Sequence, residues 1–430
     1  MGKTDNGIFK RINDKRNVIA SMPALLLCVA TLFVLLLDIT MPSMKDAQYL
    51  VYPILFRIVG LISLLFTSLC LAIDIDNDSL HMDASDICFV VFFVCVVIST
   101  CINGWSSQAL FGLKYRYIGV LDLFIFMVSY MYCSCRIRSE KWKDTILIGF
   151  ITVADIIAVT FICSETFAHI PAFEGKLDFA GMFYHGNHYG YFLSIAVAIA
   201  AAYFVLDEGR KAAIGGFSFA LNCIVMLINQ TRGSVLGAGF AIILLIIWLL
   251  IKEKGKSKKA RYLAIGFPLA IVLSLLFSGG FRAEVTEMTK EMLLILSGTN
   301  DLFAGNGRWG IWQYVIDWTM ERPVWGFGNE GIADTLYELA ETPSPHNEPL
   351  TYAAFFGIPA AVSYIVGVLI RIVDTLRNKT ADNTEIIAGI AATAYFISSV
   401  FGVAMFYTTP FLFIMLGLCH REKSCKRDAL

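Results

Sequence analysis

Charged residues are scarce in this chain of 430 residues, which is 57% hydrophobic and only 16% charged. A soluble domain carries about 25% charged residues, so this chain cannot cover its surface with groups that water solvates. This excludes a soluble enzyme and a disordered chain. An excess of basic residues is also missing, since the formal net charge is -1. The chain therefore lacks the basic face that a nucleic-acid binder needs.

Pairs of cysteines in the CxxC pattern are absent, although the chain has 11 cysteines. Most of them, including Cys28, Cys95 and Cys223, lie in or at the ends of apolar runs. We interpret them as small buried side chains rather than as a redox or metal centre.

Apolar runs are what the sequence has in abundance, and several approach the roughly 20 residues that cross a bilayer. The hydropathy pattern predicts an all-α integral membrane protein with about twelve transmembrane helices. We expect them at residues 18–37, 50–73, 86–102, 117–135, 144–164, 189–206, 213–229, 234–251, 262–279, 350–370, 385–403 and 409–419.

The distribution of charge predicts the topology. Most of the 34 basic residues fall in alternate segments between the apolar runs, most densely from Lys252 to Arg261. By the positive-inside rule these segments and both termini are cytoplasmic. The chain then divides into residues 1–279 with helices one to nine, a large extracytoplasmic loop at 280–349, and residues 350–430 with helices ten to twelve.

The long loop has a pattern of its own. Apolar residues recur at helical intervals over 281–296 and 309–320, which predicts two amphipathic helices. Four of the seven tryptophans lie at 309–325, where they either anchor the loop at the interface or stack on a sugar ring. GFGNEG at 326–331 fits a dinucleotide pattern without its βαβ context, so we interpret it as a tight turn. We expect the glycines at 233–239 to let helices approach closely.

Arginines on the outer side are few, and three stand out. Arg57 lies inside helix two, where it either snorkels to the interface or lines a polar cavity. Arg116 lies between helices three and four. Arg232 lies in the tight turn before helix eight, with no carboxylate nearby in the sequence to pair with it. Several guanidinium groups at the mouth of an apolar bundle suit an anion that the membrane delivers, such as a polyprenyl pyrophosphate.

Histidines on the outer side offer a base. His346 precedes helix ten, where its ring is either a general base or a helix cap. His185 and His188 could join it in a metal cluster, but the three lack a dedicated ligand spacing. We therefore expect no metal.

The sequence resembles the O-antigen ligase and polymerase superfamily at these same residues. GNGRWGIWQYVIDWTMERPVWGFGNEG followed by SPHNEPLTYAAFFGIPA is similar to the family's Arg-Trp helix, glycine turn and His-Asn pair. Upstream, GMFYHGNHYGYFL and QTRGSVLGAGF resemble two further family segments. Thr231 stands where the family has Ser. Met182 stands where the family has Thr, and this second departure weakens any role of the GMFYHGNHYGYFL segment beyond shape.

The resemblance implies a metal-independent GT-C-like glycosyltransferase, without a cofactor, in the cell inner membrane. Its members transfer a glycan from undecaprenyl pyrophosphate to a hydroxyl of a glycan or lipid acceptor. Carried over, the resemblance makes Arg232 and His346 catalytic. It also matches Arg116 to the arginine of an earlier outer loop of the family, which we expect to bind the substrate. We further expect Arg57, Arg308, Asn347 and Asn187 to bind the substrate.

Other readings of the sequence stay open. The acceptor chemistry is not specified, so polymerisation, ligation and protein O-glycosylation all fit the same donor. A flippase or secondary transporter would also be apolar and carry an intramembrane arginine. Transporters often contain internal repeats or broken helices, and the sequence indicates neither. A peptidoglycan polymerase of the cell-elongation type would instead rely on an acidic residue in the outer loop.

Overall fold

The computed structural model describes residues 21–22, 24–31, 51, 53–62, 64–65, 82–114, 117–137, 139–166, 183, 185–252, 258–277, 279–297 and 307–420. Within these residues the regular structure is entirely helical, as the hydropathy pattern predicts. The predicted segments 18–37 and 50–73 lie only partly inside the described residues, where the described positions are helical.

Seven described helices are long and apolar enough to cross a membrane, and the chain is therefore a multi-pass membrane protein. They are α3 (Ala84–Asn103), α6 (Glu140–Thr166), α7 (Gly186–Leu206), α8 (Gly209–Asn229), α9 (Arg232–Lys252), α10 (Lys258–Phe277) and α15 (Ile358–Arg377). Shorter apolar helices are found at Pro53–Ile62, within α5 (Val120–Arg136) and at α17 (Thr409–Leu418).

Helix α7 forms the core of the bundle, and nearly all of its side chains are buried. It packs against α8, α9 and α16 (Asn383–Ser399). Helices α9 and α16 approach closely at Gly237, where a Cβ atom would lie 2.1 Å from the Ser398 hydroxyl oxygen. The expectation that a glycine lets two helices meet here is confirmed.

The single helix predicted at 350–370 is wrong, because the chain forms two helices there. Helix α14 (Glu348–Phe356) ends at Gly357, which has φ +93°, and α15 begins at the next residue. A Cβ atom at Gly357 would lie 2.0 Å from the carbonyl oxygen of Val324, so no other residue fits. Apolar residues continue on both sides of Gly357, so the hydropathy pattern does not reveal the break.

The GFGNEG segment is a tight turn, as we expected, and it covers the end of α14. Gly326 and Gly328 have φ +61° and +82°. The backbone N–H of Phe327 donates to the carbonyl of Ala354 at 3.0 Å, and that of Gly328 to Phe355 at 2.8 Å. These two hydrogen bonds therefore fix the turn to the C-terminal end of α14.

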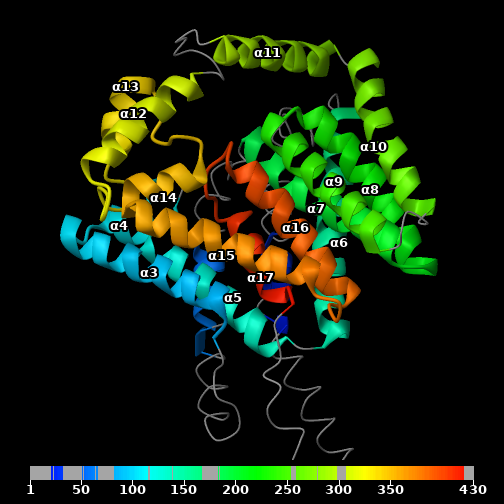
Figure 1. The fold of residues 1–430 in the computed structure, drawn as a ribbon, viewed down its shortest axis with the longest axis horizontal. Coiled ribbons are helices and arrows are strands. Elements are labelled where there is room, and N and C mark those ends of the chain that lie inside the picture. The colour runs from blue at the N-terminus through cyan, green and yellow to red at the C-terminus, as the bar shows by residue number, and fades with distance from the viewer. Residues whose placement is uncertain are drawn as a thin grey trace, which may run out of the picture.

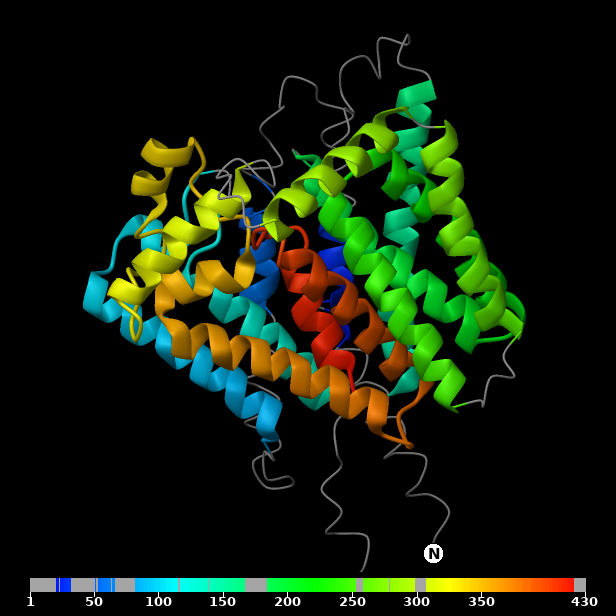
Figure 2. The same ribbon diagram turned by 45° about the horizontal axis from the view of Figure 1, so that its top comes forward.

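Two helices of the long loop are present where the sequence predicts them, as α11 (Gly279–Leu296) and α12 (Arg308–Glu321). A third, α13 (Ala333–Ala340), was not predicted. Helix α11 runs from the end of α10 across the top of the bundle in Figure 1. Helices α16 and α17 lie between the group formed by α3 and α12–α15 and the group formed by α7–α10, as both views show (Figures 1 and 2).

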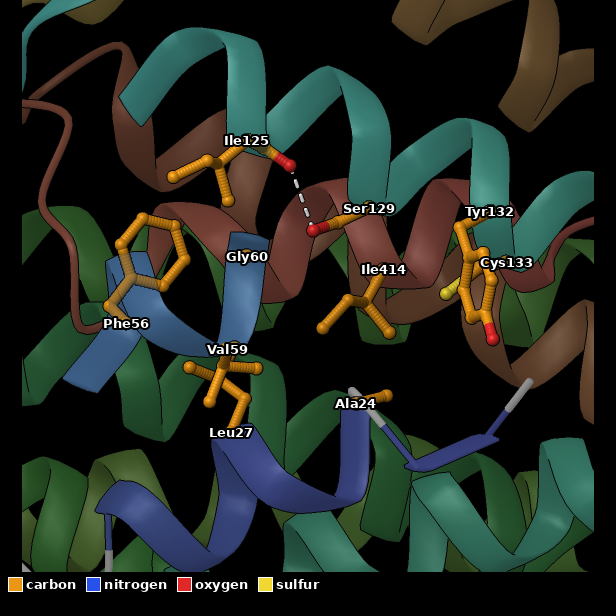
Figure 3. A pocket seen from close by; sticks show the side chains of 10 residues that line it. All are labelled: Ala24, Leu27, Phe56, Val59, Gly60, Ile125, Ser129, Tyr132, Cys133 and Ile414. Atoms are coloured by element: carbon orange, nitrogen blue, oxygen red, sulfur yellow. Dashed lines mark hydrogen bonds between the residues drawn. The ribbon is translucent and has the colours of Figure 1, made fainter. Parts of the chain in front are cut away.

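An apolar cavity of about 10 Å³ lies between α5, α17 and the N-terminal helical segments. Ala24, Phe56, Val59 and Ile414 face it in Figure 3. The hydroxyl of Ser129, which also lines it, already donates to the carbonyl of Ile125 at 2.8 Å. This cavity offers little to a polar substrate.

Candidate active site

Arg232 is the first residue of α9, at a turn that is fixed to α7. Gln230 ends α8 in the left-handed conformation, with φ +60°. The side chains of Asn229 and Thr231 both donate to the carbonyl of Gly186 at 3.0 Å, which ties the turn to the start of α7. The expectation that no carboxylate pairs with Arg232 is wrong. Its Nη2 lies 3.4 Å from Oε2 of Glu287, which α11 brings over the turn.

His346 lies just before α14 in a strained backbone conformation, with φ +53°. Its backbone N–H donates to the Ser344 hydroxyl at 3.3 Å, and its Nε2 lies 3.3 Å from the hydroxyl of Thr342. The indole N–H of Trp312 donates to the carbonyl of Pro345 at 2.8 Å, which ties the segment to α12. His346 is thus held next to the helix start without being its cap.

The cap of α14 is Asn347. Its Oδ1 accepts from the backbone N–H of Leu350 at 2.9 Å, which satisfies one of the free N–H groups at the helix start. The Asn347 side-chain oxygen is therefore already occupied by the helix cap, and a substrate bound by Asn347 would have to share this oxygen with α14.

The segment around Phe401, between α16 and α17, joins these elements. Its carbonyl accepts from Nη1 of Arg308 at 3.1 Å and from the hydroxyl of Tyr191 at 2.7 Å. The Phe401 ring packs against Trp312, with ring centroids 6.2 Å apart. A Cβ atom at Gly233, next to Arg232, would lie 3.1 Å from Phe401 Cβ. The starts of α9 and α12 therefore meet at Phe401, and Trp312 connects the segment before His346 to them.

The start of α7 brings two more histidines to this region. His185 caps α7 through its Nδ1, which accepts from the backbone N–H of Asn187 at 3.2 Å. Desolvation, together with the positive charge of Arg308, lowers the pKa of His185 below its usual 6.5. His188 lies 5.5 Å from His185 between ring centroids. Among the described residues, no group of three His, Cys, Asp or Glu side chains could hold a metal ion.

Arg57 forms an ion pair with Asp122, at the start of α5. Its Nε and Nη2 each donate to Asp122 at 2.9 Å, and Nη2 also donates to the carbonyls of Phe111 and Tyr117. Asp122 is fully buried. The intramembrane charge of Arg57 thus has a partner and supports the chain before α5. Arg116, in that same stretch, lies outside the described residues.

Glu348 is the residue that the sequence did not single out. Its side chain is fully buried, and three tyrosine hydroxyls donate to it. It lines a cavity of about 30 Å³, together with Ser344 and Thr351. Burial raises the pKa of its carboxyl group. In the sequence, an acidic residue in the first turn of a helix predicts nothing beyond a favourable interaction with the helix dipole.

A family model described as O-antigen ligase matches residues 217–365. This chain carries an O-antigen ligase domain. The match contains the starts of α9 and α12, which meet at Phe401, and the His346 segment, which is bonded to α12 through Trp312. Substrates of the O-antigen ligase family are lipid-linked glycans. A comparison with curated proteins finds no match.

Proposed function

We propose that this protein of the O-antigen ligase family is a membrane glycosyltransferase. It transfers a glycan from undecaprenyl pyrophosphate to an acceptor hydroxyl on the outer face of the cytoplasmic membrane. The observation that carries the proposal is that Phe401 contacts the starts of both α9 and α12, at Gly233 and at Arg308, while Trp312 of α12 binds the segment before His346. Arg232, Arg308 and His346 all lie within residues 217–365, which match the O-antigen ligase model.

The arginines bind the donor and stabilise its leaving group. Pyrophosphate is already a good leaving group, so the protein has to stabilise the negative charge that develops as the anomeric bond breaks. A guanidinium group suits this task, because its planar donors match two phosphate oxygens at once. Arg232 stabilises the charge that develops on the leaving group. Arg308, at the start of α12, binds the same donor.

His346 acts on the acceptor, as the base that removes its proton. An attacking hydroxyl has to lose its proton as the new glycosidic bond forms, and a neutral imidazole can take that proton near neutral pH. The contact of Nε2 with Thr342 supports the proposal, since a hydroxyl partner orients the ring without charging it. The candidate binding roles of Asn187, Asn347, Arg57 and Arg116 remain predictions.

The topology that goes with this function has both termini in the cytoplasm and a GT-C-like bundle of about twelve spans. Residues 1–279 and 350–430 supply the spans, and residues 280–349 form the outer loop over the site. The basic residues between α9 and α10 support this orientation.

Reconstitution of the purified protein in liposomes with an undecaprenyl-pyrophosphate oligosaccharide tests the proposal. We expect glycan to leave the lipid, as a ladder of products if the acceptor is a growing glycan and as one discrete product if it is another acceptor. His346→Ala should lower the rate by about 10²–10⁴-fold. A lipid-linked glycan that crosses the bilayer with its sugar–phosphate bond intact would instead identify a flippase. Loss of activity in EDTA would contradict a metal-independent reaction.

A further inference from the structure

Glu348 occupies an unusual site for an acidic residue. Its Oε1 accepts from the hydroxyls of Tyr352 at 3.1 Å and Tyr364 at 2.8 Å, and its Oε2 accepts from Tyr395 at 2.9 Å. All three tyrosines are buried. Among the described residues, no Lys or Arg forms an ion pair with Glu348. A buried carboxyl group is costly unless its oxygens are satisfied, and here hydroxyl groups alone satisfy them.

The hydrogen bonds around Glu348 have a consistent direction. The backbone N–H of Met405 donates to the Thr409 hydroxyl at 2.8 Å, and that hydroxyl lies 2.6 Å from the hydroxyl of Tyr395. With Thr409 donating to Tyr395 and Tyr395 donating to Glu348, every proton points toward the carboxylate. The chain of bonds links α14 to α15, α16 and the start of α17.

The backbone next to Glu348 explains why such an anchor is needed. His346 has φ +53°, a conformation that costs a residue other than glycine free energy and persists only where its surroundings enforce it. The Ser344 hydroxyl and the bond between Trp312 and Pro345 hold the segment before His346. After His346, the fixed point is the start of α14, where Asn347 caps the helix and Glu348 ties it to α15 and α16.

We propose that Glu348 is a positioning residue for His346, which fixes the imidazole toward the acceptor through the start of α14. The proposal rests on the proposed glycan transfer. It assigns Glu348 to the acceptor step, because Glu348 forms its hydrogen bonds with tyrosines of α14, α15 and α16, whereas Arg232 and Arg308 begin α9 and α12. Weakening the anchor should therefore lower kcat and leave the KM for the lipid-linked donor unchanged.

The test compares two tyrosines in reconstituted full-length protein. Tyr364→Phe removes one hydroxyl from Glu348 and should lower kcat about 10-fold, since small misplacements of a catalytic group cost up to about 100-fold. The matched control is Tyr203→Phe. Tyr203 is equally buried, and its hydroxyl donates to the Asp144 carboxylate at 2.8 Å, but α7 places it away from His346. The Tyr203→Phe variant should lose as much stability as Tyr364→Phe, but its kcat should stay at the wild-type value.

Glu348→Gln provides the second variant, because it keeps the size of the side chain and removes the charge. We expect its kcat to fall further than that of Tyr364→Phe, at an unchanged donor KM. Wild-type kcat in both variants, an equal fall in kcat for Tyr203→Phe, or a change in donor KM alone would overturn the positioning role. Failure of the proposed function has a different signature: the wild-type protein itself would release no glycan from the donor.

Discussion

Arg371 and Arg232 are both arginines of an apolar bundle, and their surroundings differ. Arg371 on α15 is 2% exposed, and its guanidinium lies 2.8 Å from Asp83 and 3.0 Å from Asp86, with the hydroxyl of Tyr130 also in contact. The carboxylate partner of Arg232 is Glu287 at 3.4 Å, whose side chain is 59% exposed. An enclosed network is fixed, whereas an exposed pair contributes little and can exchange its carboxylate for a phosphate.

Arg57 belongs with Arg371 in this comparison. Its partner Asp122 is fully buried and binds two of its nitrogens, so a donor phosphate would have to displace an interaction that supports the chain. Arg308 belongs with Arg232, because its described hydrogen bond is to the carbonyl of Phe401 and leaves other N–H groups for a ligand. The comparison separates arginines that hold the fold from those at the candidate site.

The largest effect is expected where the enclosed network is broken. Arg371→Leu leaves Asp86 buried without its cation, which should destabilise the protein by about 3–5 kcal/mol. Thermal unfolding of the detergent-solubilised protein measures this loss. An unchanged Tm would show that the network is not structural.

The next effect should appear in activity rather than stability. Arg232→Ala removes a donor of charge-assisted hydrogen bonds to the leaving group, and we expect transfer to slow by about 10²–10³-fold. Its Tm should stay near that of the wild type, because the pair with Glu287 is exposed. Arg232→Lys, which keeps the charge and loses the fork geometry, should recover part of the rate. Equal rates for all three proteins would remove Arg232 from the mechanism.

Arg308 should have a smaller effect, mainly on donor binding. Loss of one charge-assisted hydrogen bond corresponds to about 1.5 kcal/mol, or about tenfold. We therefore expect Arg308→Gln to raise the donor KM about tenfold in the reconstituted assay. A change in kcat alone would instead place Arg308 with the reacting groups.

The smallest effect is expected for Glu287, and it has the opposite sign. Glu287→Gln removes the carboxylate that competes with phosphate for Arg232, so the donor KM should fall about two- to fivefold. Titration of the initial rate against donor concentration measures it. A rise in KM would mean that Glu287 takes part in binding the substrate.

Hydropathy predicts the fold well where each helix is a continuous apolar run. The segments predicted at 213–229 and 234–251 correspond to α8 and α9 within a few residues. The break at Gly357 escapes the prediction, because apolar residues continue on both sides and only the approach of Val324 requires a glycine there. Hydropathy also fails to predict helix α13, because this helix is short and contains no continuous apolar run.

The candidate site residues can be singled out in the sequence, but their structural partners cannot. Arg232 and His346 stand out because charge and imidazole are rare at the ends of apolar runs. Their contacts join distant parts of the chain: Glu287 is 55 residues from Arg232, and Asp122 is 65 residues from Arg57. Glu348 has no sequence signal, because Tyr364 and Tyr395, two of its three partners, come from other helices.

Binding of undecaprenyl pyrophosphate, measured beside transfer for the same proteins, tests the central claim most directly. The account predicts that Arg232→Ala binds the lipid pyrophosphate more weakly and transfers little glycan. It predicts that His346→Ala binds the lipid like the wild type and transfers little. Wild-type binding by Arg232→Ala, or lost binding by His346→Ala, would contradict the assignment of the donor to the start of α9 and of the acceptor proton to His346.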